Sequence, residues 1–405
     1  MFALTLPLSK SAGNVLLFLI YPAVAAGALF YKDFRQALVA NIRQPLTVAF
    51  LLYYLVALVG VLFTESYADG LRVANKFSSM PAIYLMASAL IQAIADDGKR
   101  QQTVESLLFF FLIGLMGLNG IGMVTWLGFL GHERFALPLA PMNVHHIWYS
   151  NINALGLYIA AAFLLFSPRG REGRDRLFLI SSIVFAVLGI LLSISRTAWF
   201  GVALTSVIMI FLVTKKKKAA LIAVAATAAV GAAAFWLIPF VHDRISLIAS
   251  DIEQFFAGEP SGSLGGRFLM WKASLMMFLS NPLTGVGTGD YVSTMIAYVK
   301  SEQLPEFLLQ FNQPHNMYLF ALATNGLPGL AALVYIFYRA LSFALPKLKG
   351  GEGERLLAFV AAAAAVHFLI AGLTDSFFNI QILRYAFVLI MGVCVRGSLE
   401  AARSS

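Results

Sequence analysis

Apolar segments about 20 residues long, enough for a helix to cross a bilayer, recur along the whole 405-residue chain. The composition agrees with this pattern, because 60% of the residues are hydrophobic and only 12% are charged. Soluble domains carry about 25% charged residues, and a soluble protein of this size cannot bury so much apolar surface. We therefore exclude a soluble enzyme, a disordered chain and a secreted disulfide scaffold. The chain is predicted to form an all-α polytopic membrane helix bundle.

Eleven segments have the length and hydropathy of membrane spans. The single cysteine, Cys394, excludes an intramolecular disulfide and a cysteine metal cluster. The predicted spans lie near residues 14–31, 46–63, 80–95, 104–126, 147–166, 177–195, 196–213, 219–240, 315–338, 355–373 and 378–396.

Basic residues are concentrated in every second connecting segment, which hold 19 of the 29 lysines and arginines. The positive-inside rule predicts that these segments are cytoplasmic. The net charge of +9 is then explained mainly by the orientation of the chain in the membrane. Nucleic acid is therefore not expected as a partner. The C-terminus is predicted to be cytoplasmic and, with eleven spans, the N-terminus lies outside. The basic set is Lys32, Arg35, Arg43, Lys99, Arg100, Arg169, Arg171, Arg174, Arg176, Lys215 to Lys218, Arg339, Lys347, Lys349, Arg355, Arg396 and Arg403.

Residues 241–312 form the only large predicted extramembrane segment, and alternation places it on the outer side. We expect a flexible hinge at Ser261–Gly266, an amphipathic helix over Arg267–Leu279 and a second helix over Tyr291–Lys300. The first helix is rich in large apolar side chains, so it can lie on the membrane surface. We interpret the segment as a cap over an outward-facing cavity; the alternative is a plain connector. The predicted division is 1–240 (N-terminal membrane helices), 241–314 (large loop) and 315–405 (C-terminal membrane helices).

Two arginines lie at predicted outward-facing helix starts. Arg196 lies between two spans, after the candidate N-cap Ser195, and an arginine there is costly unless it faces protein or a polar cavity. Arg267 follows two glycines, which allow an anion close to the backbone N–H groups of a helix start, and Trp271 lies on the same helix face. Alternatively, Arg196 extends to the membrane interface and Arg267 is a solvated loop residue.

A histidine lies at a third helix start. His315 follows Pro314, which favours a helix beginning here. The helix N-terminus disfavours an imidazolium, so a neutral ring able to accept a proton is expected; the alternative is a structural cap. Together with the two arginines, His315 predicts a site for a polyanion such as pyrophosphate beside a general base.

Several further residues are weaker candidates. His145 and His146 precede an outer span start and could contact a headgroup or a metal, but no acidic or cysteine cluster has ligand spacing. We therefore predict no metal and no cofactor. Asp375 and Arg384 are expected to pair with each other or to line the cavity, and His367 is interpreted as a packing residue. Gly326-Leu-Pro-Gly329 is expected to kink its span and open a lateral gap for lipid.

The chain resembles the bacterial O-antigen ligases, within the wider group of O-antigen polymerases and protein O-oligosaccharyltransferases. The resemblance rests on Ser195-Arg196-Thr197, on Gly266-Arg267 with Trp271, on His315-Asn316-x-Tyr318-Leu319, and on the large late loop. It implies a GT-C-like, metal-independent, inverting glycosyltransferase of lipopolysaccharide biosynthesis. Such an enzyme moves a glycan from undecaprenyl pyrophosphate to a sugar hydroxyl of lipid A–core at the periplasmic face of a Gram-negative inner membrane.

The resemblance also assigns residues. Arg196 and Arg267 match the family's essential arginines and His315 its essential histidine, with Trp271, Asn316 and Tyr318 expected at the substrate. Family members have twelve spans and two cytoplasmic termini, which implies one segment missed in the N-terminal third. The alternatives are an O-antigen polymerase, a protein O-oligosaccharyltransferase and, in another class, a transporter for the lipid-linked glycan. Membrane lipids are expected partners, and no oligomeric state is predicted.

Overall fold

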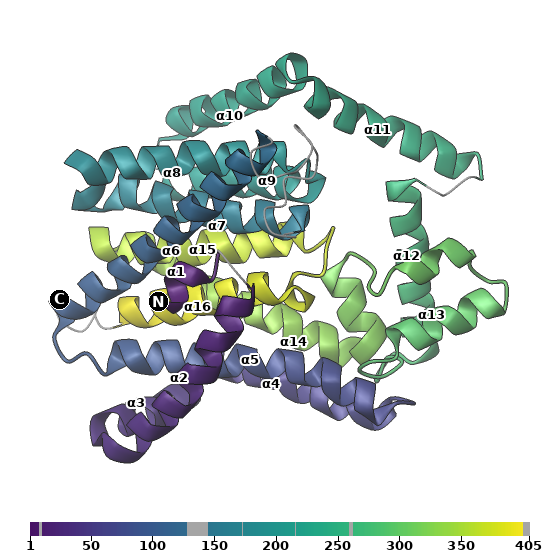
Figure 1. The fold of residues 1–405 in the computed structure, drawn as a ribbon, viewed down its shortest axis with the longest axis horizontal. Helices are drawn as coiled ribbons and strands as arrows, with labels where there is room; N and C mark the ends of the chain where they lie inside the picture. Colours follow the sequence, from purple (N-terminus) through teal and green to yellow (C-terminus); the bar gives the residue numbers. More distant parts are fainter. Residues whose placement is uncertain (8–9, 128–144, 172, 215, 259–261, 400–405) are drawn as a thin grey trace.

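The computed structural model describes residues 1–7, 10–127, 145–171, 173–214, 216–258 and 262–399. This part of the chain consists of α-helices, short 3-10 helices and turns, without a β-strand (Figure 1). The all-α prediction is confirmed. Lys215, Ser261 and Arg403, which the predictions above include, lie outside the described residues. The helices are α1 (Phe2–Thr5), α2 (Lys10–Phe30), α3 (Lys32–Ile42), α4 (Pro45–Gly60), α5 (Tyr67–Gln92), α6 (Asp97–Trp126), α7 (His146–Phe166), α8 (Gly173–Leu192), α9 (Arg196–Val213), α10 (Lys217–Leu237), α11 (Pro239–Phe256), α12 (Ser263–Ser280), α13 (Tyr291–Lys300), α14 (Met317–Lys347), α15 (Glu352–Ala371) and α16 (Gln381–Leu399).

Among the described residues, 8 segments are long and apolar enough to cross a membrane, and each coincides with a predicted span. The predicted spans near 14–31, 80–95 and 378–396 are also helical, as α2, α5 and α16, but they are not among these 8. The chain is therefore a multi-pass membrane protein. The 8 segments are Pro45–Phe63, Asp97–Thr125, His146–Phe166, Gly173–Leu192, Arg196–Val213, Lys217–Leu237, Met317–Lys347 and Glu352–Ala371.

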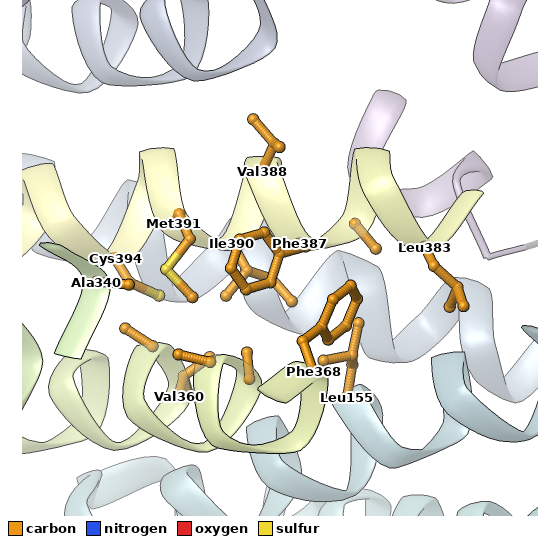
Figure 2. Packing of buried hydrophobic residues seen from close by; sticks show 14 of the residues in the cluster. Leu155, Ala340, Val360, Phe368, Leu383, Phe387, Val388, Ile390, Met391 and Cys394 are labelled. Carbon is orange, nitrogen blue, oxygen red and sulfur yellow. The ribbon is translucent and has the colours of Figure 1, made fainter. Parts of the chain in front are cut away.

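The centre of the bundle is built around α15, which packs against α7, α9, α14 and α16. The run Ala361–Ala365 is buried, and its small side chains let neighbouring helices approach closely. Aromatic rings fill the remaining space, with the ring centroids of Phe368 and Phe387 4.7 Å apart (Figure 2). His367 is fully buried and forms hydrogen bonds through Nε2 with Asn151 and through Nδ1 with Tyr158, as expected of a packing residue.

Basic segments from separate loops meet at one end of the bundle, which we call the basic end. Arg171, between α7 and α8, pairs with Glu352 at the start of α15, and the Arg355 guanidinium lies 4.4 Å over the ring of Phe166. The last turn of α16 lies at the same end in Figure 1, whereas α12 and α13 lie at the other. We call that other end the loop end. The gathering of basic loops agrees with the charge pattern on which the predicted topology rests.

The described part of the predicted large loop contains three α-helices and the 3-10 helix Glu306–Gln310, and the sequence located two of the α-helices. The predicted helix over Tyr291–Lys300 is α13, and α12 ends at Ser280 beside the predicted stop Asn281. The helix α11 was missed, although Pro239 occupies its first turn, where proline is favoured. The hinge prediction is wrong for Ser263–Gly266, which form the first turn of α12 after its N-cap Gly262.

The predicted kink in α14 is confirmed at Gly326, whose φ of 61° and ψ of −156° are not helical. A turn of the preceding loop occupies the kink: Leu327 N donates to Pro282 O at 2.8 Å, and Val286 N donates to Ala323 O at 2.8 Å. A Cβ atom on Gly326 would lie 2.5 Å from Pro282 O, so only glycine fits here. The kink thereby fastens the loop to α14.

Candidate functional site

The candidate residues gather at the loop end, where α7, α9 and α14 begin and α11 and α12 lie close by. Two of the three non-glycine residues with positive φ among the described residues are found here, Ile194 (φ 53°) and His315 (φ 49°). Such a backbone costs about 1–3 kcal/mol and is typical of functional sites. The strained backbone at Ile194 and His315 therefore marks the loop end as the candidate functional site.

The turn between α8 and α9 positions Arg196. Ser195 is the N-cap of α9, as predicted, and its Oγ accepts from Ala198 N at 3.4 Å. The Trp199 indole N–H donates to Ile190 O at 2.8 Å and ties α9 back to the end of α8. Arg196 is therefore held as the first residue of α9.

Arg196 points toward protein and not toward the membrane interface. Its guanidinium lies 3.5 Å from Asp251 Oδ2 of α11, and the two side chains are only 13% and 11% exposed. The N-cap of α12 packs against the same carboxylate, since a Cβ atom on Gly262 would lie 2.5 Å from Asp251 Oδ1. The pair thus joins α9, α11 and α12, and Asp251 offsets part of the arginine charge.

Arg267 lies in the second turn of α12, not at its start as predicted, because the helix begins at Ser263. Burial lowers the pKa of the Arg267 guanidinium; Asp375 and Asp251 oppose this shift, whereas Arg196 and Arg244 add to it. Arginine stays protonated in proteins, so the site contains a partly buried positive charge among other arginines.

Arg244 of α11 is a site residue that the sequence analysis missed. Its Nε is buried and has no hydrogen-bond partner in the part of the chain that the structure describes. The guanidinium interacts electrostatically with Arg196, Arg267 and His146. Among the described residues, neither Arg244 nor Arg267 lies within ion-pair distance of a carboxylate. The sequence feature that could have indicated Arg244 is its position seven residues before Asp251. Residues seven apart lie on the same face of a helix, so the two charged side chains are expected on one face.

A cavity of about 380 Å³ opens beside Arg244. The apolar side chains of Phe240, Leu247 and Ile194 line it together with the polar residues His146, Ser193, Asp243 and Arg244. A cavity that combines an unpaired guanidinium with apolar walls suits an amphiphile with an anionic group.

His315 faces Asp375, which was expected either to pair with Arg384 or to line the cavity. Its Nδ1 lies 3.2 Å from Asp375 Oδ1, and the two side chains are 21% and 1% exposed. The expected pairing of Asp375 with Arg384 is wrong, because Arg384 donates to Phe378 O and Ser79 Oγ.

The contact with Asp375 bears on which ring nitrogen of His315 can act as a base. A carboxylate facing Nδ1 favours the tautomer with the proton on Nδ1 and the lone pair on Nε2. The helix N-terminus that was expected to keep the ring neutral begins only at Met317, after the N-cap Asn316. The carboxylate, and not the helix end, orients the base.

Asn316, Tyr318 and Trp271 hold the His315 segment in place. The Asn316 side chain accepts from the N–H groups of Tyr318 and Leu319 and donates to Leu373 O, each at 3.0 Å. The Tyr318 hydroxyl donates to Leu369 O at 2.7 Å, and the Trp271 indole N–H donates to Pro314 O at 3.0 Å. These contacts favour a positioning role over the substrate contact expected from sequence.

We predict that Asn316→Ala disturbs the fold of this segment, whereas Asn316→Ser is tolerated. Loss of an N-cap costs about 1 kcal/mol and serine caps nearly as well as asparagine. Thermal unfolding of the two purified variants in detergent measures the difference. Equal stability of Asn316→Ala and the unmodified protein would contradict the capping role.

His145 and His146 stack on each other beside the site, with ring centroids 4.4 Å apart. His145 is the N-cap of α7, and its Nδ1 accepts from Ile147 N at 3.4 Å. Burial lowers the pKa of His145, Asp375 opposes this and His315 adds to it. The pair therefore lies within electrostatic range of Asp375. Among the described residues, no group of three or more His, Cys, Asp or Glu side chains is arranged to hold a metal ion.

Part of the chain matches a known family. Residues 181–334 match the family model described as O-antigen ligase. The match supports a place for this segment in the O-antigen ligase and polymerase superfamily, with a glycosyltransferase-like function. It includes Arg196, Arg244, Arg267 and His315, whereas Asp375 lies beyond it. No curated protein matches the chain.

Proposed function

We propose that the protein is an O-antigen ligase. It transfers a glycan from undecaprenyl pyrophosphate to a sugar hydroxyl of lipid A–core, at the periplasmic face of a bacterial inner membrane. The observation that carries the proposal is the pairing of His315 with Asp375, within electrostatic range of the unpaired Arg267. A general base beside uncompensated cations suits transfer from a pyrophosphate leaving group to a hydroxyl.

Arg267 and Arg244 hold the pyrophosphate. Both lack a carboxylate partner among the described residues, and guanidinium groups bind phosphate oxygens in bidentate fashion. The first isoprene units of the donor occupy the cavity lined by Phe240 and Leu247. Arg196, oriented by Asp251, adds positive charge where the leaving group develops negative charge.

His315 activates the acceptor. Its Nε2 takes the proton of the acceptor hydroxyl, and the hydroxyl oxygen forms a bond to the anomeric carbon. The bond from that carbon to the pyrophosphate oxygen breaks on the opposite face, so the configuration inverts. The electron pair leaves with undecaprenyl pyrophosphate, which the arginines stabilise. Asp375 stabilises the imidazolium that forms. No metal takes part in this scheme.

Reconstitution in liposomes tests the proposal. The full-length protein receives the lipid-linked glycan donor together with lipid A–core, a second lipid-linked glycan and pilin, in buffer with a metal chelator. We expect covalent transfer to lipid A–core, detected by mass spectrometry. Elongated lipid-linked glycan would indicate a polymerase, glycosylated pilin a protein oligosaccharyltransferase, and translocation without transfer a transporter. Activity that disappears only with the chelator would contradict the metal-independent mechanism.

A further inference from the structure

Three arginines meet around a second cavity, at the opposite end of the bundle from His315. The cavity has a volume of about 430 Å³ and is lined by Arg43, Arg339 and Arg396. They come from three separate elements: Arg43 is the C-cap of α3, Arg339 lies in α14, and Arg396 lies in the last turn of α16. The C-terminal ends of α3 and α16 lie at the basic end of the bundle, where Figure 1 shows them.

The charge around this cavity is not balanced by its walls. None of its described lining residues is acidic, and neither Arg43 nor Arg339 lies within ion-pair distance of a carboxylate in the described chain. By contrast, the neighbouring Lys347 at the end of α14 pairs with Glu354 at 2.6 Å. Like charges that converge on one cavity repel each other, so an anion in the cavity would stabilise their arrangement.

Arg339 also offers an unused hydrogen-bond donor. The Nε atom of Arg339 is buried without a hydrogen-bond partner among the described residues, which costs free energy in the absence of an acceptor. Arg396 is only 8% exposed, so its charge is presented inside the protein and not to bulk water. A phosphate group satisfies both the charge and the donor geometry of guanidinium groups.

The remaining walls indicate an amphiphile. Leu46, Phe343 and Val395 line the same cavity as the arginines, next to helices that cross the membrane. Basic pockets between membrane helices at the basic side of a protein are suited to anionic lipid headgroups. A free phosphate ion would use the arginines but leave the apolar walls without a partner.

We propose that this cavity binds the phosphodiester headgroup of an anionic glycerophospholipid, with the first part of an acyl chain against Leu46 and Phe343. The site is separate from the glycosyl-transfer site, since its residues lie at the other end of the bundle. The proposal requires only that the bundle spans a membrane, and it stands or falls independently of the transfer reaction.

Native mass spectrometry of the full-length protein in detergent tests this site. Phosphatidylglycerol, phosphatidylcholine with the same acyl chains, and inorganic phosphate are added separately. We expect retention of phosphatidylglycerol, and weaker retention by about fivefold for each of Arg339→Gln and Arg396→Gln, the size expected for one arginine near a lipid phosphate. Arg35→Gln is the matched control, because Arg35 is an exposed residue of α3 that does not line the cavity.

The outcomes separate the explanations. If Arg35→Gln weakens phosphatidylglycerol retention as much as the cavity variants do, the attraction to the basic end is non-specific and the proposal is overturned. Retention of phosphatidylcholine equal to that of phosphatidylglycerol would also overturn it. Binding of inorganic phosphate that displaces phosphatidylglycerol would also overturn it, because the ligand would then be a free anion. If Arg339→Gln fails to fold, Arg339→Lys keeps the charge and changes the hydrogen-bond geometry, so it tests the same site. Unchanged retention of phosphatidylglycerol by His315→Ala is expected if the lipid site and the transfer site are separate.

Discussion

His315→Ala is expected to lower the rate of glycan transfer to lipid A–core by about 10²–10⁴-fold, the contribution of a positioned general base. The ring of His315 faces Asp375 through Nδ1 at 3.2 Å, which leaves Nε2 to accept the acceptor proton. The side chain is 21% exposed and lies before the membrane-crossing segment Met317–Lys347, so its removal leaves the packing of that segment intact. The variant should therefore insert and fold normally. Transfer by purified protein in liposomes, with both lipids supplied, measures the effect.

The matched control for this prediction is His242→Ala. His242 is an exposed histidine of α11 that contacts Phe235 and Trp236, and its loss should leave transfer unchanged. Asp375→Asn should reduce kcat more than it changes the KM for the donor, because the hydrogen-bond-distance contact of Asp375 is with the general base His315. Transfer at the normal rate by His315→Ala would remove the general base from the mechanism.

Arg267→Ala is expected to reduce transfer by about 10²–10³-fold, by analogy with the loss of one donor to a developing anion. Arg244→Ala should have a comparable effect, since both arginines are free of carboxylate partners in the described chain. Part of the loss should appear as weaker donor binding, because a guanidinium contacts the pyrophosphate before and during the reaction. Steady-state kinetics with varied donor concentration separates kcat from KM.

Two further variants test whether the effect is specific to Arg244 and Arg267. Lys272→Ala removes an exposed positive charge from the same helix, α12, and should have no effect beyond general electrostatics. The double variant Arg244→Ala, Arg267→Ala should reduce the transfer rate by less than the product of the two single-variant fold reductions. The reason is that the effects of residues that bind the same group are not additive. Normal donor binding by Arg244→Ala would limit the anion site to α12 and α9.

The interpretation of Arg196 changes with the structure. The sequence treats Arg196 and Arg267 as equivalent clamps, but Arg196 is already paired with Asp251 at 3.5 Å. A paired arginine offers less net charge to a ligand than an unpaired one. We therefore propose that Arg244, and not Arg196, is the main partner of Arg267 in binding the pyrophosphate.

The sequence by itself determined the features that depend on neighbouring residues along the chain. Hydropathy over about 20 residues predicts spans, and the 8 membrane-competent segments found among the described residues were all located in this way. Local rules also identified Ser195 as an N-cap, Gly326 as a kink and Tyr291–Lys300 as a helix. Each of these outcomes is fixed by backbone hydrogen bonding and side-chain size within a few residues.

Only the tertiary structure decided which charges share a site. Asp375 lies 60 residues after His315, and Asp251 lies 55 residues after Arg196, so no local rule links them. Arg244 was missed because a charged residue of a loop is ordinarily solvated, whereas the packing of α11 near the starts of α7 and α9 buries its Nε. Ion pairing and burial depend on distances through space, which helix packing sets and sequence spacing does not.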